Sequence, residues 1–355
     1  MINITAPINN LGYGIASFNI IKQLINMKED VILHPIGPID QMVDGDFLQG
    51  IIKKFNKDDL RLAVPSVKIW HQNDIHTHIG KGSHIGFPIF ELDRFTDVEI
   101  CSMKHNDKIF VCSEWAKNII EKESYLSHID VHVVPLGVDS SLFKPSLSNR
   151  NTTVFFNCGK WEIRKGHDIL VDCFNEAFSE EDDVELWMMC ENPFLGDKNN
   201  DWIKLYKGSN LGHKIRIIPR QRSQIDVYNI MLQADCGVFP ARAEGWNLEL
   251  LEMMACGKQV IATDYSGHTE FCNDSNTMLV DTPSLETAFD GQWFFGDGLW
   301  ASIQEEQKLQ ISEYMRNVHE KKKEGNLSLN REGVISAERL SWRNSANLFL
   351  EGINK

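Results

Sequence analysis

The feature of this sequence that most constrains its fold is a repeated alternation between short apolar runs and segments of helical periodicity. Each apolar run has the length of a β-strand, and a turn and then a helix-like pattern follow several of them. Strands and helices that alternate in this way form parallel sheets with crossover helices. The alternation occurs in both halves of a 355-residue chain, which is too long for one small core. The sequence therefore predicts two α/β domains.

The predicted elements fall into two groups on either side of a connector, Val134–Arg150, that is rich in proline and polar residues. We place the first domain at 1–145 and the second at 151–335. Strands are expected at Met1–Thr5, Val31–His34, Val67–His71, Lys108–Cys112, Val131–Val134, Thr153–Asn157, Val184–Cys190, Lys214–Ile218, Cys236–Phe239, Gln259–Ala262 and Met278–Val280. Helices are expected at about 15–26, 113–122, 166–178, 299–323 and 334–353.

Charge and composition argue against several classes of partner. The formal net charge is −14, and neither half of the chain offers the basic face that a nucleic-acid backbone requires. The same balance argues against firm anchoring on an anionic membrane. Eight cysteines are scattered without a C-x-x-C pair, which favours buried reduced thiols over a metal or redox site. Neither a signal-peptide pattern nor an apolar run of membrane length occurs, so we expect a cytoplasmic protein.

The loop after the first predicted strand, Asn9–Gly14, is one place where a ligand could bind, because ligands of open parallel sheets lie at the carboxyl ends of the strands. Gly12 and Gly14 allow the backbone to come close to a phosphate at a helix N-terminus. A tight turn between strand and helix explains the same glycines equally well. The loop is not a full G-x-G-x-x-G fingerprint, because Ser17 holds the last place.

The loop after the strand Thr153–Asn157 carries Gly159, Lys160 and Lys165. Gly159 permits close backbone approach, and both lysines could reach a diphosphate and stabilise it as it departs. The alternative is a pair of solvated lysines near a helix start. Positive charge at a helix N-terminus opposes the helix dipole, however, so these lysines need another reason to be there.

The loop after the strand Cys236–Phe239 carries two glutamates eight positions apart, Glu244 and Glu252. They could bracket a ligand that lies along the helix N-terminus, where the free N–H groups near Asn247 and Leu248 would meet an anion. The alternative is an ordinary acidic helix start, since glutamate is favourable at that end of a helix.

Other polar groups of the first half allow several interpretations. His71, His76, His78 and His84 cluster after a strand, and we favour hydrogen-bonding histidines over a metal site there. Asp44-Gly45-Asp46 mimics the D-x-D of metal-dependent transferases, but a turn is the better interpretation.

Several segments in order along the chain resemble glycosyltransferase family 4, whose members are retaining enzymes with the GT-B fold. The most specific segment is PARAEGWNLELLEMMACGKQVIATDYSGHTEF (Pro240–Phe271), which matches the family's E-x(7)-E signature. GKWEIRKGHDIL (Gly159–Leu170) matches its G-R…K-G motif, with Lys160 in place of the usual arginine. Weaker similarities are VPLGVDSSLFKP (Val134–Pro145), NLGYG, IGFPIFELDRF (Ile85–Phe95) and LSWRNSANLFLEGI (Leu340–Ile353).

This resemblance implies a fold and a set of roles. It implies two facing Rossmann-like domains with a deep cleft between them and a closing helix at about 340–355 that returns to the first domain. Glu252 would bind the ribose hydroxyls, Glu244 would lie by the donor sugar, and Lys165 would bind the diphosphate. Backbone amides around Asn247–Glu249 would hold the sugar or phosphate. Asn247 stands where the family often has glycine, which leaves the sugar open.

On the first-domain side, the resemblance implies that Gly12 and Tyr13 close over the donor. A family histidine near the sugar or the acceptor often lies in this domain, and His71 at its strand end is our choice for it. Glu91 and Asp93 are candidates for acceptor binding, and capping of the next helix is their alternative role.

We therefore expect a metal-independent, retaining transferase without a cofactor that uses a UDP-, GDP- or ADP-sugar. The sequence does not indicate the acceptor, which could be a glycan, a lipid-linked glycan, a small molecule or a protein, nor the oligomeric state. Two alternatives stay open: a non-catalytic sugar-nucleotide-binding subunit of a transferase complex, and a sugar-nucleotide epimerase on the same fold. A nicotinamide oxidoreductase is more distant, because no glycine loop carries the full fingerprint.

Overall fold

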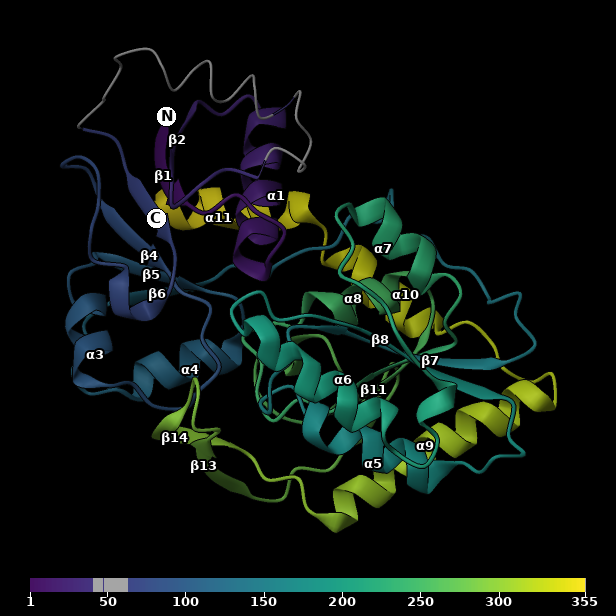
Figure 1. The fold of residues 1–355 in the computed structure, drawn as a ribbon. Coiled ribbons are helices and arrows are strands. Elements are labelled where there is room, and N and C mark those ends of the chain that lie inside the picture. Colours follow the sequence, from purple (N-terminus) through teal and green to yellow (C-terminus); the bar gives the residue numbers. More distant parts are fainter. Residues whose placement is uncertain (41–46, 48–62, 355) are drawn as a thin grey trace. The chain divides into compact units, whose positions relative to one another are not determined.

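The computed structural model describes residues 1–40, 47 and 63–354, and it divides the chain into two compact units (Figure 1). Unit 1 comprises Met1–Gly137 and Leu340–Lys355, and unit 2 comprises Val138–Arg339. Within the described residues, each unit is built on its own six-stranded sheet, and every strand pair in these two sheets is parallel. No described helix is long and apolar enough to cross a membrane.

Unit 1 has the strand order β2-β1-β3-β4-β5-β6. The strands are β1 (Ile2–Ala6), β2 (Val31–Pro35), β3 (Ser66–Ile69), β4 (His84–Phe87), β5 (Lys108–Val111) and β6 (Asp130–Val133). The helices of unit 1 are α1 (Gly12–Asn26), α3 (Asp97–Met103), α4 (Glu114–Lys122) and α11 (Trp342–Asn354). Part of its core is formed by side chains of β5 and β6 packed against α3 and α4, such as Ile109, Met103 and Ile120.

The last helix, α11, packs in unit 1, as predicted for the closing helix, and Figure 1 shows it in yellow beside α1. The Phe349 ring lies 5.5 Å from that of Phe110 on β5. A Cβ added at Gly352 would come within 2.7 Å of Phe110 and 2.5 Å of His132, so only glycine lets the helix come this close. The Lys108 ammonium donates to the Gly352 carbonyl at 3.0 Å. These contacts hold the end of the chain on the sheet of unit 1.

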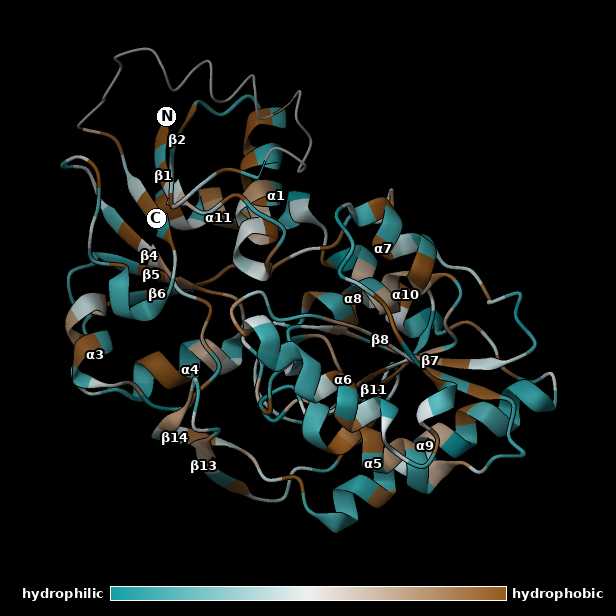
Figure 2. Ribbon diagram, in the orientation of Figure 1, coloured by the Kyte–Doolittle hydropathy of each residue, from teal (hydrophilic) through white to brown (hydrophobic). Residues whose placement is uncertain are grey.

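Unit 2 has the strand order β12-β11-β10-β7-β8-β9. The strands are β7 (Thr153–Gly159), β8 (Val184–Cys190), β9 (Ile215–Ile217), β10 (Cys236–Phe239), β11 (Gln259–Thr263) and β12 (Met278–Val280), and β13 (Leu285–Phe289) and β14 (Phe295–Ala301) form a separate antiparallel hairpin. The helices are α5 (His167–Ala177), α6 (Asn199–Lys207), α7 (Gln224–Met231), α8 (Leu248–Ala255), α9 (Glu305–Lys323) and α10 (Arg331–Arg339). Its core joins strand side chains to those of α5 and α9, such as Phe155, Phe174 and Met315. Buried strands of this kind are coloured as hydrophobic along much of their length in Figure 2.

Several sequence predictions need correction. The first helix begins at Gly12 rather than Ile15, so both loop glycines lie in its first turn. The strand β4 was not predicted, because Gly86 weakens its apolar pattern. Glycine is needed at this position because a Cβ there would lie 2.5 Å from the Ile75 side chain. Asp44-Gly45-Asp46 lies outside the described residues.

The two helices predicted near the C-terminus also differ from the structure. Residues 299–301 belong to β14, and the helix α9 begins only at Glu305. The predicted helix overlaps this strand only at Leu299, Trp300 and Ala301, an apolar run that fits a strand and a helix start equally well. The second predicted helix, over 334–353, is divided into α10 and α11, because the Ser341 hydroxyl accepts from the Asn344 N–H and begins a new helix.

Each parallel sheet has one point where the strand order reverses direction, and ligands of such folds bind there, beyond the carboxyl ends of the strands. In unit 1 this point lies between β1 and β3, and in unit 2 it lies between β7 and β10. The loops that the sequence analysis selected follow these four strands.

Candidate active site

The candidate site of unit 2 is formed by the two loops that follow β7 and β10. Backbone contacts hold the loops together: the Arg242 N–H donates to the Arg164 carbonyl at 2.6 Å, and Arg164 Nη1 donates to the Ala243 carbonyl at 2.6 Å. Gly166 has a positive φ of 72°, and an added Cβ would lie 2.0 Å from the Pro240 carbonyl oxygen. Glycine at this position therefore lets the two loops come into contact.

Five charged side chains from these loops form a continuous set of ion pairs, which we call the charge cluster: Lys160, Glu162, Arg164, Lys165 and Glu244. Lys160 Nζ lies 2.9 Å from Glu162 Oε1, and Arg164 Nη2 lies 2.7 Å from Glu162 Oε2. Glu244 is held from two sides, by Arg164 Nη1 at 2.9 Å and by Lys165 Nζ at 2.6 Å. Lys160 and Lys165, which the sequence analysis proposed as diphosphate ligands, are thus joined through two glutamates and an arginine.

Burial and pairing set the protonation states within the charge cluster. Burial alone would raise the pKa of Glu244, but the cations Arg164 and Lys165 outweigh it and lower the pKa to about 2. Burial alone would lower the pKa of Lys165, but Glu244 outweighs it and the pKa is raised. Glu244 and Lys165 are therefore both charged near neutral pH. The cluster gathers three basic side chains around two carboxylates, and such a group of basic side chains suits an anionic ligand.

The N-terminus of α8 lies at the end of the second loop. Asn247 is its N-cap, with a left-handed backbone (φ 80°) and a side-chain oxygen that accepts from the Leu250 N–H at 3.2 Å. Glycine and asparagine adopt this conformation most readily, which explains why asparagine can stand where the resembled family often has glycine. The first N–H groups of α8, beginning at Leu248, carry the partial positive charge of a helix N-terminus.

Glu252 lies one turn into α8 and is 7% exposed. Among the residues that the structure describes, no side chain or backbone group donates a hydrogen bond to its carboxylate. Burial, and secondarily the nearby Glu249, raises the pKa of Glu252 well above its usual value. The residue is largely buried, but its oxygens are not among the described polar atoms that are fully enclosed without a partner, so a ligand with hydroxyl donors can reach them.

A buried hydrogen-bond network fixes the first loop from below. His167 Nδ1 accepts from the Glu162 N–H at 3.2 Å, and its Nε2 lies 2.9 Å from Asn157 Oδ1. Burial, with Lys165 as the second cause, lowers the pKa of His167 to about 3, so the ring is neutral. Asn157 in turn donates to the Val238 carbonyl on β10 at 2.6 Å. His167 is therefore a positioning residue that links β7, β10 and the charge cluster.

Comparison with known proteins identifies this region of the chain. Residues 152–290 match the sequence family described as "Glycosyl transferases group 1". Unit 2 contains a group 1 glycosyl transferase domain. This match covers both loops of the charge cluster and α8, and it confirms the resemblance drawn from the E-x(7)-E and K-G segments.

The relatives of the chain carry the same class name. Glycosyltransferase 45 of a Sulfolobus islandicus filamentous virus is 23% identical over 75% of this chain, and an uncharacterized glycosyltransferase of Methanocaldococcus jannaschii is 27% identical over 66%. The D-inositol 3-phosphate glycosyltransferase of an Arthrobacter species is 26% identical over 48%. These alignments cover 72%, 58% and 42% of the respective relatives, so the chain spans only part of their length. We class the protein as a glycosyltransferase.

Solved structures confirm the fold class. The sucrose-phosphate synthase of Thermosynechococcus elongatus has a TM-score of 0.71 at 13% identity, over 99% of this chain and 98% of that one. The Anabaena protein HepE, solved in complex with UDP and glucose, has a TM-score of 0.70 at 13% identity, over 100% of this chain and 99% of that one. The glycosyltransferase therefore has the GT-B fold, with the two Rossmann-like units described above.

The candidate residues in unit 1 of the glycosyltransferase are near one another at its own reversal point. The Tyr13 ring lies 4.8 Å from that of His71. Burial raises the pKa of Tyr13 well above its usual value, and the nearby Glu91 carboxylate raises it further. The Tyr13 hydroxyl donates to the Ile89 carbonyl and accepts from the Ile89 N–H, both at 2.8 Å. The hydroxyl is thus used inside unit 1, where it positions the segment that carries Glu91.

The glycines after β1 have different reasons to be there. A Cβ at Gly14 would lie 2.3 Å from the Asn9 carbonyl oxygen, so Gly14 is needed for packing. An added Cβ at Gly12 would meet nothing within 4 Å, and this residue is exposed, so the space over Gly12 is open to a ligand. Asp93 and Glu91 do not cap the next helix, because Thr96 and Glu99 form the capping box of α3.

The remaining histidines after β3 make hydrogen bonds and ring contacts. His76 Nδ1 lies 3.1 Å from Ser102 Oγ, and His78 Nε2 lies 2.8 Å from Asn106 Oδ1. The His84 ring stacks on that of His78 at 4.6 Å. In the part of the chain that the structure describes, no group of three or more His, Cys, Asp or Glu residues is arranged to hold a metal ion. The geometry thus favours the hydrogen-bonding interpretation over the metal site.

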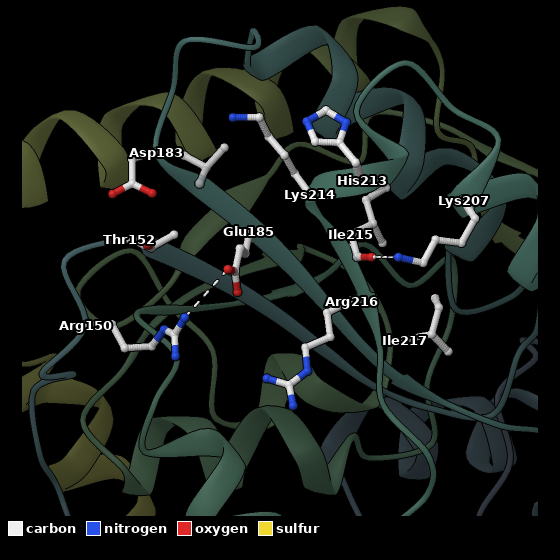
Figure 3. Close-up of a pocket in the computed structure, with 11 residues that line it drawn as sticks. Arg150, Thr152, Asp183, Glu185, Lys207, His213, Lys214, Ile215, Arg216 and Ile217 are labelled. Carbon is white, nitrogen blue, oxygen red and sulfur yellow. Dashed lines mark hydrogen bonds and ion pairs between the residues drawn. The ribbon is translucent and has the colours of Figure 1, made fainter.

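A surface hollow of about 560 Å³ lies elsewhere on unit 2, at the amino ends of β7, β8 and β9 (Figure 3). Two lysines that line it donate to backbone carbonyls of the protein, and Arg150 pairs with Glu185. The Lys207 ammonium donates to the Ile215 carbonyl, and the Lys214 ammonium donates to the Asp182 carbonyl at 2.5 Å. This hollow lies at the edge of the sheet opposite the reversal point, so it is not the candidate active site.

Sequence reasoning missed two members of the charge cluster, Glu162 and Arg164. The signal was present as alternating charge in the segment KWEIRK, but the sequence alone does not show which cations pair with which carboxylates. Arg164 is only 4% exposed. A buried arginine beside Lys165 requires acidic partners, and Glu244, already singled out, was one of the available ones.

Proposed function

We propose that this glycosyltransferase moves a sugar from a nucleoside diphosphate sugar to an acceptor with retention of anomeric configuration. The observation that carries this proposal is the charge cluster, with its two lysines and its arginine, beside the N-terminus of α8 at the reversal point of unit 2. Charged groups and helix dipoles that are aimed at a departing diphosphate stabilise it in the transition state. The Anabaena protein of the same fold was solved with UDP and glucose, which supports the ligand class.

In this proposal each part of the site has a distinct role. Lys165 and Lys160, with the α8 N–H groups near Leu248, bind the diphosphate and stabilise the charge that develops on it. Glu252 accepts hydrogen bonds from the two ribose hydroxyls. Glu244 orients Lys165 and lies next to the donor sugar. Within unit 1, His71, Glu91 and Asp93 are the residues that we propose for contact with the acceptor.

The direct test is a thermal-shift screen with UDP, GDP, ADP and their sugars. A ligand that binds only the folded state raises the free energy of unfolding by about 2.7 kcal/mol at 100 times its Kd. We expect one nucleoside diphosphate to raise Tm clearly more than the other two. The absence of any shift at millimolar concentrations of all three would contradict the proposal.

The variant Glu252→Gln tests the ribose role through opposite effects on stability and binding. Because burial raises the pKa of Glu252 above its usual value, the native protein is relatively more stable below that usual value and loses this stability as pH rises through the raised pKa. We expect the ligand-free variant to have a higher Tm than wild type at pH 8, with the difference vanishing near pH 4. At the same time its affinity for the nucleoside diphosphate should fall about 10-fold or more, since hydrogen bonds to a charged group contribute about 1.5–3 kcal/mol each.

Isothermal titration calorimetry and thermal melts at both pH values measure these quantities. The matched control is Glu306→Gln, which changes an exposed carboxylate in the first turn of another helix of unit 2, α9. Unchanged nucleotide affinity in Glu252→Gln would rule out the ribose role.

We further propose that transfer needs no divalent metal, because the cations of the charge cluster can supply the positive charge that a metal supplies elsewhere. We expect the rate of sugar transfer or donor hydrolysis to be the same with EDTA as with Mg²⁺ or Mn²⁺. A complete loss of activity in EDTA that returns on addition of metal would overturn this part of the proposal.

A further inference from the structure

The hairpin formed by β13 and β14 carries large apolar side chains on its exposed face as well as on its buried face. Strand alternation places Glu286, Ala288 and Trp300 on the inner face, where Ala288 and Trp300 are buried. Phe289 and Phe295 are a cross-strand pair on the outer face, and they are 61% and 62% exposed. The solvent-facing side of a hairpin normally carries polar side chains, so this exposed apolar face is expected to meet another molecule.

Other exposed apolar side chains of unit 2 extend this face. Leu285 on β13 is 39% exposed, and Trp293 in the turn is 43% exposed. The Trp293 ring lies 6.2 Å from that of Phe194, which follows β8 and is 61% exposed. We call these five residues, Phe194, Leu285, Phe289, Trp293 and Phe295, the aromatic surface. Figure 2 shows the strands of the hairpin in hydrophobic colours.

The aromatic surface is directly connected to the candidate active site. Lys160 Nζ, which pairs with Glu162 in the charge cluster, lies 5.8 Å from the centre of the Phe194 ring. At its other end the hairpin is attached to the loop after β10, because the Ala301 N–H donates to the Arg242 carbonyl at 2.8 Å. A molecule on the aromatic surface therefore lies next to a proposed diphosphate ligand, which is where a transferase must place its acceptor.

The charges of this region restrict what can bind. Residues 281–304 include four acidic residues and no lysine, arginine or histidine. Asp290 is occupied by the turn, where its carboxylate accepts from three backbone N–H groups, among them that of Trp293 at 2.7 Å. Asp297 is exposed on β14, two residues along the chain from Phe295. Such a surface repels anionic lipid and nucleic acid.

A neutral carbohydrate fits both features of the surface. The C–H faces of a sugar ring are apolar and pack on exposed aromatic rings, while its hydroxyls donate hydrogen bonds to a free carboxylate such as Asp297. We propose that the aromatic surface binds the acceptor and that this acceptor is an uncharged carbohydrate. This inference rests on the proposed function and adds the chemical class of the second substrate.

The test measures sugar binding by itself, without turnover. Saturation-transfer difference NMR is recorded on the full-length protein with the methyl glycosides of glucose, galactose, mannose and N-acetylglucosamine and with the corresponding disaccharides. We expect at least one of them to bind to wild type. Trp293→Ala and Phe295→Ala should each raise its Kd about 2- to 10-fold, the range expected for loss of one aromatic contact. Trp293→Phe should retain most of the affinity.

Two controls and two rival outcomes make this test decisive. Ile225→Ala and Leu309→Ala remove other exposed apolar side chains of unit 2, which are 48% and 46% exposed, and should leave sugar binding unchanged. No sugar binding to wild type, or equal binding to Trp293→Ala and Phe295→Ala, overturns the proposal. So does a dimer that Phe295→Ala abolishes in analytical ultracentrifugation, or binding to neutral phosphatidylcholine vesicles that Trp293→Ala abolishes.

The nucleotide-induced rise in Tm is measured on the same wild-type sample. A nucleotide shift without sugar binding contradicts only the inference about the aromatic surface. The absence of a nucleotide shift contradicts the proposed function itself.

Discussion

Replacement of Lys165 by alanine should lower kcat about 10²- to 10³-fold, with a smaller rise in the KM for the donor. The diphosphate of the bound donor is already negative, so Lys165 contributes to the ground state and the transition state alike. As the glycosidic bond breaks, further negative charge develops on the leaving oxygen, and a fixed ammonium interacts more strongly with it. Only this increment appears in the chemical step.

The charge cluster explains why binding should suffer less than turnover. Lys160 remains in the Lys165→Ala variant, and Glu244 keeps its contact with Arg164, so the site still carries cations for the bound diphosphate. Steady-state kinetics over a range of donor concentrations separate the two effects. The exposed Lys204, which pairs only with Asp201 at the surface, provides the matched control Lys204→Ala. A raised KM with kcat intact would show that Lys165 supplies uniform binding only.

Replacement of Glu244 by glutamine or alanine should destabilise the folded protein by about 3–5 kcal/mol, since it leaves the buried Arg164 and the nearly buried Lys165 without their shared carboxylate. Denaturant unfolding followed by a probe of unit 2 measures this loss. Removal of Glu249, a half-buried carboxylate in the first turn of α8, is the matched control and should cost far less. An unfolding free energy equal to that of wild type would contradict the assignment of Glu244 as the centre of the cluster.

The pH dependence of the same variants provides a second check. The pKa of Glu244 is lowered to about 2 in the folded protein, so its contribution is fully present above the ordinary value of 4.5 and is lost as pH falls from there towards 2. We expect the difference in Tm between wild type and Glu244→Gln to be constant from pH 5 to 7 and to shrink at lower pH. A difference that grows on acidification would have the wrong sign.

Much of this arrangement could be predicted from the sequence, because a parallel α/β pattern brings the loops after its strands to one edge of each sheet. That rule alone placed Lys160 and Lys165 near Glu244, although these residues lie some eighty positions apart. The helix over 248–255 and its proposed contact with an anion followed from the same pattern. The structure adds the distances, and the roles of these residues in binding and transfer stay predictions.

Other features could not be predicted, for identifiable physical reasons. The pairing of Arg164 with Glu162 and Glu244 depends on how two loops meet, and periodicity carries no information about that. The Tyr13 hydroxyl donates to the Ile89 carbonyl instead of facing a ligand. These two residues are far apart in the sequence, so only the structure shows that they are in contact. Residues 299–301 of β14 were assigned to a helix because a short apolar run fits a strand and a helix start equally well.

The central claim is that a nucleoside diphosphate binds to unit 2 between the loops after β7 and β10. A crystal structure of the chain with the nucleoside diphosphate that gives the largest rise in Tm tests this claim most directly. We expect the diphosphate to contact Lys165, Lys160 and the first N–H groups of α8, and the ribose hydroxyls to donate to Glu252. A diphosphate that contacts only residues before Val134 would contradict the claim.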